Sequence, residues 1–380
     1  MKDDKIKIVI VAPVHQWGDV RVFKKEAVSY AEQGFDVTLI ARAPNFIHSD
    51  GVKIVPRWGD FDSRLLRFLS LPFVLIQTFL NRADVYHLHN PDTIPIAFIL
   101  KLFGRHYIYD THEDFEKRIL IREWIYPSLR KILAFLVSRA EKVVCKFSIS
   151  TFVTQESVAN RLGEKSLVVG NAPRHNKKMY DRVYQEVSNI DSGNTDFRLV
   201  YLGLINKSRG LFSMVEALEY VNKKHSCRLW LIGPADPEDL NKARLMAGWE
   251  YVDYIPSVEQ ELAFAYVVKS DVGLIYIDDV GGHKYTDPNK IYEYMAFSKP
   301  FIASDFEMWR DKLGRLGAGI FISAGSSTNL SLAVENMVGL NAEEREEMGR
   351  KGREYINIYN WQNEFDKILS VYEAYFNVGN

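Results

Sequence analysis

The chain has 380 residues, of which 47% are hydrophobic and 26% charged, and its formal net charge is −1. Because single hydrophobic cores stop growing at about 250–300 residues, we expect two domains. The only cysteines are Cys145 and Cys227, which argues against a disulfide framework or a clustered zinc site and favours a reducing compartment. Charged residues at positions 2–7 interrupt any signal peptide, and the longest apolar run, residues 69–80, is too short and too broken to span a bilayer.

The two halves of the chain differ in charge. Residues 1–175 carry 25 Lys and Arg against 19 Asp and Glu, a net charge of +6, whereas the remainder carries 23 against 30, a net charge of −7. A cationic half favours an anionic acceptor or membrane surface, although two solvated surfaces can differ this much by chance. The basic residues are scattered, which argues against nucleic acid as a partner. We expect a cytoplasmic protein, free or peripheral on the inner face of the plasma membrane.

The first part of the chain alternates strand and helix patterns. Residues 6–12 have the pattern of a buried strand, residues 20–33 have helical spacing, and residues 36–41 form the next strand, which makes a β-α-β unit. Further strand-like runs, most of them separated by helical stretches, lie at residues 52–55, 85–88, 107–109, 143–145 and 167–169. This alternation predicts a parallel sheet.

A second series of the same kind follows. Residues 171–196 hold few large aliphatic side chains and are the best candidate for a linker. Strand-like runs then recur, again separated by helical patterns, at residues 197–203, 228–232, 251–255, 272–277, 300–303 and 320–322. Beyond Asn341 the pattern is helical to the end, with an apolar stripe of Trp361, Phe365, Ile368, Leu369 and Tyr372. The predicted fold class is α/β, with two doubly wound, Rossmann-like domains.

The most informative stretch runs from Pro288 to Pro300. It places Lys290 and Glu293 three residues apart at a predicted helix start, between the strand-like runs 272–277 and 300–303. Ligands of open α/β sheets bind outside the carboxyl ends of the strands, which is where such a helix begins. On an isolated helix the two residues would more simply be an ordinary surface pair, which contributes only ~0.2–0.5 kcal/mol, and the other motifs of the chain reverse that preference.

The tract resembles the P-x-K-x-x-E-Y-M-A-x-x-x-P signature of family 4 retaining glycosyltransferases, in which two Rossmann-like domains face a cleft in the GT-B fold. The charged pair, Ala296 and Pro300 all fall in register. The resemblance extends over nearly the whole chain. It implies an acceptor-binding domain at residues 1–175, completed by a helix at about 358–380, and a nucleotide-sugar-binding domain at residues 190–357. It also implies a hexosyltransferase-type enzyme of bacterial polysaccharide biosynthesis, such as that of lipopolysaccharide or capsule.

The loop that begins at Gly203 resembles the family's G-R-L-x-x-x-K-G diphosphate-binding loop, with Arg209 at the lysine position. Leu204 replaces the first arginine, so one of two expected cations is missing, and Lys207 or Lys290 is left to supply it. Arginine can hold a phosphate bidentately where lysine acts as a point charge. Because a helix dipole repels cations at a helix start, their presence there favours a bound anion over an exposed basic surface.

The resemblance implies that Glu293 binds the ribose of the donor. Family members commonly carry a second glutamate eight residues earlier, where it contacts the donor sugar, but this chain has Tyr285 there. Tyr285, His283 or backbone amides at Gly281 and Gly282 can replace that carboxylate, so the donor sugar stays open.

The loop after the first strand has no G-x-G-x-x-G, which argues against a dinucleotide dehydrogenase. Gly18 lets the backbone approach a ligand, and Asp19 and Arg21 start a helix whose N-terminus can bind a phosphate or a sugar oxygen. Alternatively, Asp19 is an N-cap and Arg21 a surface residue. The D-x-R-V arrangement resembles a subset of the family, which implies that Gly18 binds the donor, Asp19 is catalytic and Arg21 lies on the acceptor side.

His87 and His89 alternate at the end of a predicted strand, so they share one face. Three interpretations are open: a metal site with Asp92, which lacks the further ligands that zinc needs; satisfied strand-end histidines; or an active-site role for His89. His89 matches the family's histidine that faces the transferred sugar, which implies a catalytic His89 with Asp92 on the acceptor side.

Asp110-Thr111-His112-Glu113 resembles the D-x-H-E of the same subset, which implies His112 on the acceptor side and a catalytic Glu113. An acidic cluster at a helix start, with Asp114, explains Glu113 nearly as well. No convincing D-x-D motif is present, since Asp278-Asp279 reads as a loop pair, and we expect neither a metal nor a cofactor.

Residues 64–73 and 126–136 mix basic and large apolar side chains as interfacial helices do. Core helices whose arginines reach outward are the alternative. The resemblance implies transfer of a sugar from a nucleoside diphosphate to an acceptor, a lipid-linked glycan intermediate or an oligosaccharide, with retention of configuration. A nucleotide-sugar 2-epimerase of the same fold is one alternative. A non-catalytic nucleotide-sugar-binding subunit, suggested by Leu204 and Tyr285, is the other.

Overall fold

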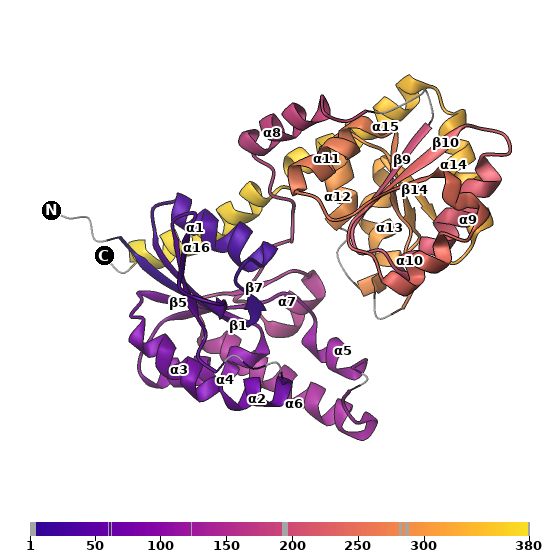
Figure 1. Ribbon diagram of the computed structural model, residues 1–380. Coiled ribbons are helices and arrows are strands. Elements are labelled where there is room, and N and C mark those ends of the chain that lie inside the picture. The colour runs from indigo at the N-terminus through magenta and orange to yellow at the C-terminus, as the bar shows by residue number, and fades with distance from the viewer. Residues whose placement is uncertain are drawn as a thin grey trace. The chain divides into compact units, whose positions relative to one another are not determined.

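The computed structural model describes residues 5–59, 61, 63–122, 124–191, 197–280, 283–285 and 289–378. The chain forms two compact units (Figure 1): unit 1 comprises residues 1–171 and 361–380, and unit 2 comprises residues 172–360. Each unit contains one β-sheet, with eight strands in unit 1 and six in unit 2. Both are α/β structures with helices on the two faces of a sheet, which is the predicted fold class.

The sheet of unit 1 has the strand order β3-β4-β2-β1-β5-β6-β7-β8. Its strands are parallel except β3, which pairs antiparallel with β4. Their bounds are β1 Lys7–Gln16, β2 Asp36–Arg42, β3 Ile47–Ser49, β4 Val52–Pro56, β5 Val85–His89, β6 Tyr107–Thr111, β7 Thr151–Val153 and β8 Ser166–Val168.

Two helical layers cover this sheet. One layer packs α3, α4, α6 and α7 against Val9, Tyr86 and Tyr109, and the other packs η1, α1 and α16 against Ile8, Leu39 and Phe152. The bounds of the helices are η1 Val20–Ala27, α1 Val28–Glu32, α2 Arg64–Leu69, α3 Leu71–Leu80, η2 Pro91–Thr93, α4 Ile94–Leu102, α5 Phe115–Leu120, α6 Pro127–Phe147, α7 Glu156–Leu162 and α16 Trp361–Val378.

The sheet of unit 2 is wholly parallel and has the order β11-β10-β9-β12-β13-β14. Its strands are β9 Phe197–Leu202, β10 Cys227–Ile232, β11 Val252–Ile255, β12 Val272–Ile275, β13 Phe301–Ser304 and β14 Gly319–Ile322. The chain crosses from β9 to β10 on one side and from β12 to β13 on the other. The sheet therefore has a switch point between the adjacent strands β9 and β12.

The helices of unit 2 also form two layers. Core residues of α8, α11, α12, α13 and α15 gather on one face, and those of α9, α10 and α14 on the other. Their bounds are α8 Lys177–Val187, η3 Lys207–Arg209, α9 Leu211–Val221, α10 Pro237–Ala243, η4 Ala247–Tyr251, α11 Gln260–Lys269, η5 His283–Tyr285, α12 Asn289–Ala296, α13 Glu307–Leu313, η6 Gly314–Leu316, α14 Ser327–Gly339 and α15 Ala342–Ile358.

Most predicted strands are present within a few residues of their expected bounds. The prediction of a strand at 143–145 was wrong, because these residues end helix α6, whose inward side chains Ala134, Ser138, Glu141 and Cys145 recur at helical spacing. The short strands β3 and β7 were missed. The expected linker at 171–196 contains helix α8, whose Val183 is buried in the core of unit 2.

The last helix, α16, packs on unit 1, and Figure 1 shows it beside α1. Its buried Trp361, Phe365 and Tyr372 belong to the predicted apolar stripe, and the rings of Phe365 and Tyr372 each lie 5.2 Å from that of Tyr30. Among the described residues, none of the helices combines the length and the apolar character needed to cross a bilayer.

Candidate functional site

In unit 1, polar side chains gather where β1, β5 and β6 end. His15 lies near the end of β1, His89 ends β5, and Asp110 lies near the end of β6. These strands are neighbours in the sheet, and the chain leaves β1 toward β2 on one side and β5 toward β6 on the other. Such a switch point is where open α/β sheets bind ligands.

Asp19 caps the helix that follows β1. Its Oδ1 accepts hydrogen bonds from the backbone N–H groups of Arg21 and Val22, both at 2.9 Å, and its Oδ2 lies 3.3 Å from Nδ1 of His15. Burial alone would raise the pKa of Asp19, but the hydrogen bonds from His15 and from Val22 outweigh it and lower the pKa to about 2. Asp19 is thus an N-cap, which leaves its predicted catalytic role open.

Gly18 and His15 border open space at this loop. A Cβ added at Gly18 would meet no atom within 4 Å, so the loop has room for a ligand there. His15 Nε2 lies 2.7 Å from the side-chain amide of Asn90, and its ring stands 5.6 Å from that of His112. His15 is therefore one of the polar groups at this edge of the sheet, although its motif had not singled it out.

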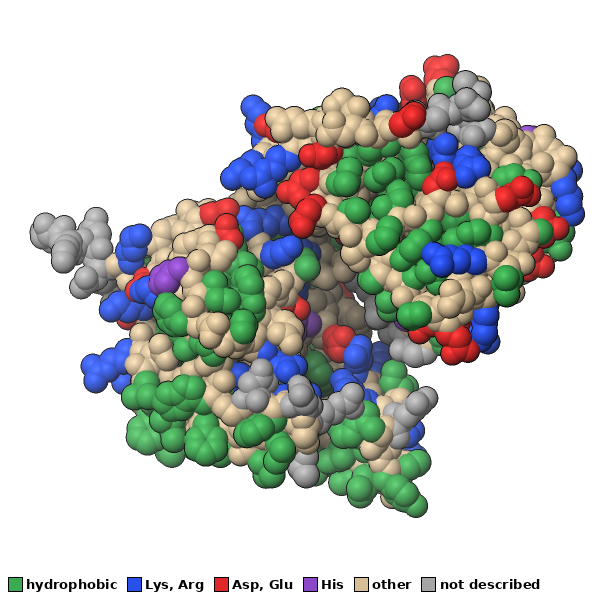
Figure 2. Space-filling model, viewed as in Figure 1, with side chains coloured by type: hydrophobic (Ala, Val, Ile, Leu, Met, Phe, Trp, Pro, Cys, Tyr) green, Lys and Arg blue, Asp and Glu red, His purple; other side chains and the backbone are tan. Residues whose placement is uncertain are grey.

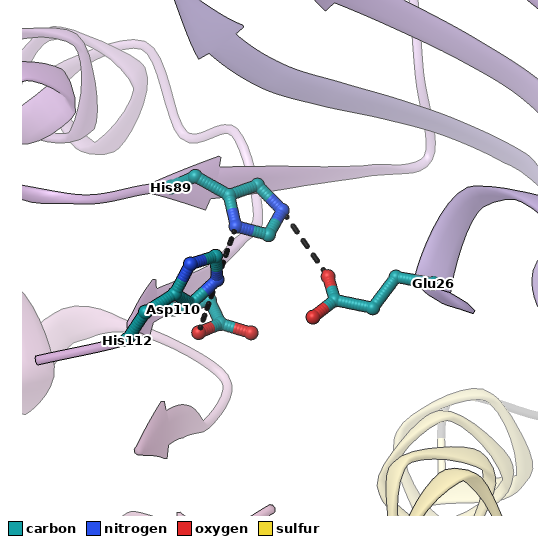
Figure 3. A group of neighbouring side chains, drawn as sticks. All are labelled: Glu26, His89, Asp110 and His112. Atoms are coloured by element: carbon teal, nitrogen blue, oxygen red, sulfur yellow. Dashed lines mark hydrogen bonds and ion pairs between the residues drawn. The ribbon is translucent and has the colours of Figure 1, made fainter. Parts of the chain in front are cut away.

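Beneath these residues lies a buried cluster composed of Arg21, Glu26, His87, His89, Asp110 and His112. Figure 3 shows four of its members pointing toward one another from η1, β5 and β6. His89 Nε2 lies 3.3 Å from Glu26 Oε2, and His89 Nδ1 lies 3.0 Å from His112 Nε2. His112 Nε2 in turn lies 3.2 Å from Asp110 Oδ1.

Arg21 is the buried cation of this cluster, not the surface residue that one interpretation assigned. Its guanidinium lies 3.0 Å from Glu26 and 3.5 Å from Asp110, and it donates to the backbone carbonyls of Val169 and Gly170. Residues 20–27 wind as a π-helix, in which backbone bonds join residues five apart. This winding brings Arg21 and Glu26, which are five apart, onto the same side.

The two carboxyl groups of the cluster differ in protonation. Burial and the charge of Asp110 raise the pKa of Glu26 well above its usual range. Burial would also raise the pKa of Asp110, but His112 and Arg21 outweigh it and hold that pKa well below its usual range. Of the two adjacent buried carboxyl groups, Glu26 is therefore the one that keeps its proton to higher pH, while Asp110 is the one that ionises, because two adjacent buried carboxylates do not both ionise readily.

Burial lowers the pKa of two histidines of the cluster, His89 and His112, and Asp110 opposes the shift without cancelling it. His87 stacks on His89 at a centroid distance of 4.6 Å, as their expected common face predicts, and its Nδ1 lies 3.3 Å from the hydroxyl of Tyr30. The buried charge of Asp110 is opposed by that of Arg21, whose guanidinium lies 3.5 Å away.

One atom each from Glu26, His89, Asp110 and His112 could hold a metal ion, because these four atoms lie within 4.8 Å of one another (Figure 3). Imidazole and carboxylate groups are ligands for zinc and related metals. Arg21 argues against this use, since a divalent cation would leave the cluster with a buried surplus of positive charge. The set differs from the one weighed in the sequence, His87, His89 and Asp92.

Asp92 lies apart from this cluster, in η2, and burial raises its pKa to about 6. Glu113 pairs at 2.6 Å with Arg118, and both side chains are more than a third exposed. Asp114 is the N-cap of α5 and accepts from the N–H of Lys117. The acidic helix start that was one interpretation of Glu113 and Asp114 is present, and a catalytic role for Glu113 stays a prediction.

Unit 2 carries the second group of site residues, at its own switch point. Lys290 and Glu293 lie on α12, with Lys290 Nζ 2.7 Å from Glu293 Oε2, and both side chains are partly exposed. A Cβ added at Gly203, just after β9, would lie 3.9 Å from Cε of Lys290. The loop after β9 and the start of α12 therefore meet, as their places in the sequence predicted.

The loop after β9 is fixed against the segment after β12. The N–H of Asp278 donates to the carbonyl of Ser208 at 3.0 Å, and a Cβ on Gly210 would lie only 2.1 Å from the carbonyl oxygen of Tyr276. Gly210 also has a φ of +74°, which favours glycine. It lies immediately before α9, whose N-terminus has no side-chain cap.

Two cations, Lys207 and Arg209, lie just before that helix start in the chain. Lys207 and Arg209 form η3, and among the described residues neither side chain pairs with a carboxylate. The backbone N–H of Lys207 donates to Asp239 at 2.7 Å, and the side chain of Asn206 accepts from the N–H of Arg209. Leu204, at the position of the missing arginine, is about half exposed.

The tract around residue 285 is described only in part. Nδ1 of His283 lies 3.0 Å from the carbonyl oxygen of Asp278, which holds the ring against the end of the strand segment. Lys284 pairs with Asp279 at 2.8 Å. The side chain of Tyr285 and the residues Gly281 and Gly282 lie outside the described part of the chain, so their predicted donor contacts stay predictions.

The fold places the chain in a structural class. Sucrose-phosphate synthase from Thermosynechococcus elongatus is similar over 98% of this chain and 100% of its own, with a TM-score of 0.73 and 16% identity. A glycosyltransferase from Rickettsia africae matches over 98% of both chains, with a TM-score of 0.70 and 12% identity. Anabaena HepE, in complex with UDP, matches over 97% and 100%, with a TM-score of 0.66 and 12% identity. The fold is GT-B.

Two family models match the sequence itself. The model described as Glycosyltransferase Family 4 matches residues 18–166, and that described as Glycosyl transferases group 1 matches residues 196–339. No protein with a curated description matches the chain. The chain belongs to the family 4-like glycosyltransferases and is a glycosyltransferase enzyme.

Proposed function

We propose that the chain transfers a sugar from a nucleoside-diphosphate sugar to a lipid-linked glycan intermediate, with retention of anomeric configuration. The observation that carries the proposal is the partly exposed pair of Lys290 and Glu293, 2.7 Å apart at the switch point of unit 2, with Lys290 close to the loop after β9. A carboxylate with two oxygens suits two ribose hydroxyls, and a nearby cation suits a phosphate.

The diphosphate would lie at the start of α9. The helix dipole and the N–H groups of an uncapped N-terminus favour an anion. Lys207 and Arg209 stand beside that helix start with no carboxylate partner among the described residues, and Lys290 completes the set. UDP bound to the similarly folded HepE is consistent with a uridine nucleotide, although 12% identity leaves the base open.

The reaction follows from the charge that develops on the leaving group. The acceptor hydroxyl forms a bond to the anomeric carbon on the face from which the diphosphate departs, the bond from that carbon to the diphosphate oxygen breaks, and the acceptor proton passes to the departing diphosphate. Preorganised cations and N–H groups stabilise this oxyanion electrostatically. No metal is required for this step, and metal independence is part of the proposal.

Unit 1 supplies the acceptor side in this proposal. The partly exposed His112 lies at the carboxyl edge of the sheet, and so does Asp19, the N-cap of η1. His89 is fully buried behind His112, so it acts on a substrate only through that residue or after a rearrangement. The acceptor belongs, in this proposal, to the assembly of a surface polysaccharide at a membrane.

A thermal-shift series with UDP, GDP, CDP and dTDP and their sugars tests the donor assignment. A ligand that binds only the folded state raises stability by RT ln(1 + [L]/Kd). We expect one nucleotide and its sugar to raise the melting temperature, and Glu293→Ala to abolish the rise. If none of the nucleotides or their sugars raised the melting temperature, the donor assignment would be overturned.

A control variant separates donor binding from folding, and a product analysis tests the proposed retention. Glu307→Ala changes an exposed carboxylate in the first turn of α13, and we expect it to keep the ligand-induced shift. Product analysis by NMR with the donor identified above then reads the anomeric configuration directly, and an inverted product would contradict the proposed retention.

A further inference from the structure

The helices of unit 1 that face away from η1 and α16 expose large apolar side chains. On α3 the outward residues Phe73, Ile76 and Leu80 are more than half exposed, although polar Gln77 and Thr78 are buried beside Leu71 and Val74. The amide of Gln77 donates to the carbonyl of Pro56. A helix that faces water usually exposes polar side chains instead of apolar ones.

Helix α6 also exposes large apolar side chains, while its inward side buries polar residues beside Ala134, Val144 and Cys145. Its buried Glu141 accepts from Tyr109 and pairs with Arg161 at 3.0 Å, and its buried Ser138 also lies inward. Outward, Ile132, Phe135 and Leu136 are each more than half exposed. Two separate helices of one layer therefore bury hydrogen-bonding groups and expose large apolar ones.

These helices form a continuous surface. The ring of Phe79 on α3 lies 5.4 Å from that of Phe103, just after α4, and Nζ of Lys101 on α4 lies 5.5 Å from the ring of Phe147 on α6. Between them Leu102 and Phe103 are about two-thirds to three-quarters exposed. Figure 2 shows hydrophobic side chains gathered along this edge of unit 1, at the lower left of the view. We call the outward side of α2, α3, α4 and α6 the apolar face.

Such a surface needs an explanation, because soluble monomers rarely expose contiguous apolar patches larger than a few hundred Å². The charges around it narrow the possible partners. Lys131, Arg139, Lys142 and Lys146 are all exposed on α6, whose only carboxylate is the buried Glu141. A second copy of the chain would bring the same cations together, which is unfavourable, whereas an anionic surface would attract them.

We infer that the apolar face docks on an anionic lipid bilayer, with its apolar side chains at the boundary of headgroups and acyl chains and its cations at lipid phosphates. This is the manner of interfacial helices, which lie in the surface without crossing it. Docking on a membrane would bring the chain to its proposed lipid-linked acceptor, and in this respect the inference rests on the proposed function. Its physical basis, exposed apolar and basic side chains, is independent of the donor site.

Vesicle co-sedimentation of the full chain tests the inference. We expect binding to vesicles of phosphatidylcholine mixed with phosphatidylglycerol, and weaker binding to phosphatidylcholine alone or at high salt. The double change Phe135→Ser and Leu136→Ser removes two apolar side chains from α6, and should lower the partition coefficient at least about tenfold. Lys142→Glu with Lys146→Glu should remove the preference for the anionic vesicles.

Matched controls lie in unit 2. Leu245 and Leu332 are 89% and 58% exposed there, so Leu245→Ser with Leu332→Ser removes apolar groups that are at least as exposed as Phe135 and Leu136 but lie away from the apolar face. We expect this variant to bind vesicles as the parent chain does. Equal losses in both double variants, or no binding of the parent chain to anionic vesicles, would overturn the inference. So would a dimer in analytical ultracentrifugation that is lost on changing Phe135 and Leu136.

Nucleotide-sugar thermal shifts on the same variants separate this inference from the proposed function. If the parent chain shows a thermal shift but does not bind vesicles, only the docking inference is overturned. If it binds vesicles through the apolar face but shows no shift with any nucleotide, the docking inference stands and the donor assignment is overturned.

Discussion

The ring of Tyr294 lies over Gly273, where an added Cβ would stand only 2.3 Å from the ring. The hydroxyl of Tyr294 donates to the carbonyl of Leu274 at 2.9 Å and accepts from the N–H of Leu202 at 3.3 Å. These contacts tie α12 to the ends of both strands at the switch point. The places of Lys290 and Glu293 therefore depend on a glycine in the neighbouring strand.

Gly273→Ala should weaken donor binding although it touches no ligand. The added methyl forces the Tyr294 ring aside, and overpacking of this kind costs about 1–3 kcal/mol of stability. Urea unfolding measures that cost, and isothermal titration with the nucleotide found above measures the affinity. Gly339→Ala is the control, because a Cβ there meets no atom within 4 Å and alanine favours a helix. Unchanged affinity in Gly273→Ala would show that α12 is held by other contacts.

Arg209 should be a specific phosphate ligand. Arg209→Ala removes a charge-assisted hydrogen bond, worth about 1.5–3 kcal/mol, so the nucleotide affinity should fall by about tenfold or more. Arg209→Lys keeps the charge but loses the fork geometry, and its affinity should lie between the two.

Arg244→Ala, at an exposed position of the same unit, controls for net charge in that titration. We expect its nucleotide affinity to equal that of the parent chain. If Arg209→Ala and Arg244→Ala behaved alike, Arg209 would be an exposed basic residue, as one interpretation of its motif held, and Lys207 and Lys290 would have to neutralise the diphosphate.

Local spacing was enough to predict the donor elements, because Lys290 and Glu293 are neighbours on one short helix. The buried cluster could not be predicted in the same way. Glu26 and Asp110 are far apart in the sequence, and only the pairing of β1 with β5 and of β5 with β6 brings their elements together. The π-helical winding of residues 20–27 also departs from the 3.6-residue period on which helical patterns are read.

The wrong prediction of a strand at residues 143–145 arose because tertiary packing outweighs local strand propensity there. Val143 and Val144 have the β-branched side chains typical of strands, yet they continue a helix because Val144 and Cys145 pack under the sheet while Val143 faces outward. The apolar face, in contrast, was visible in part. Residues 64–73 and 126–136 suggested it, but the structure adds the exposed apolar side chains at the ends of α3 and α4.

Glu26→Gln should change how stability depends on pH. The pKa of Glu26 is raised in the folded chain, so folded molecules keep a proton that unfolded ones release above about pH 4.5. The contribution of Glu26 to the free energy of unfolding should therefore fall as pH rises from there toward the folded pKa, by up to about 1.4 kcal/mol per pH unit. The lowered pKa values of His89 and His112 act in the opposite direction, but the parent chain and the variant share them. Glutamine mimics the protonated carboxyl, so this decline should disappear in the variant.

Urea unfolding of the parent and Glu26→Gln chains at several pH values measures this difference. Asp110→Asn is the informative companion, because Asp110 is the ionised partner of Arg21. Its loss leaves a buried cation unpaired, which costs about 3–5 kcal/mol at neutral pH. If Glu26→Gln were as destabilising as Asp110→Asn at neutral pH, Glu26 would be ionised and the assignment of the proton would be wrong.

Removal of metal should leave the chain unchanged. The four possible ligand atoms of Glu26, His89, Asp110 and His112 lie within 4.8 Å of one another, but Arg21 already neutralises the ionised carboxylate among them. Dialysis against EDTA should therefore change neither the melting temperature nor the nucleotide-induced shift, and zinc or manganese added at one equivalent should stay free in equilibrium dialysis. Stoichiometric metal in the purified chain, lost in His112→Ala, would instead show that the cluster binds a cation and that Arg21 moves to admit it.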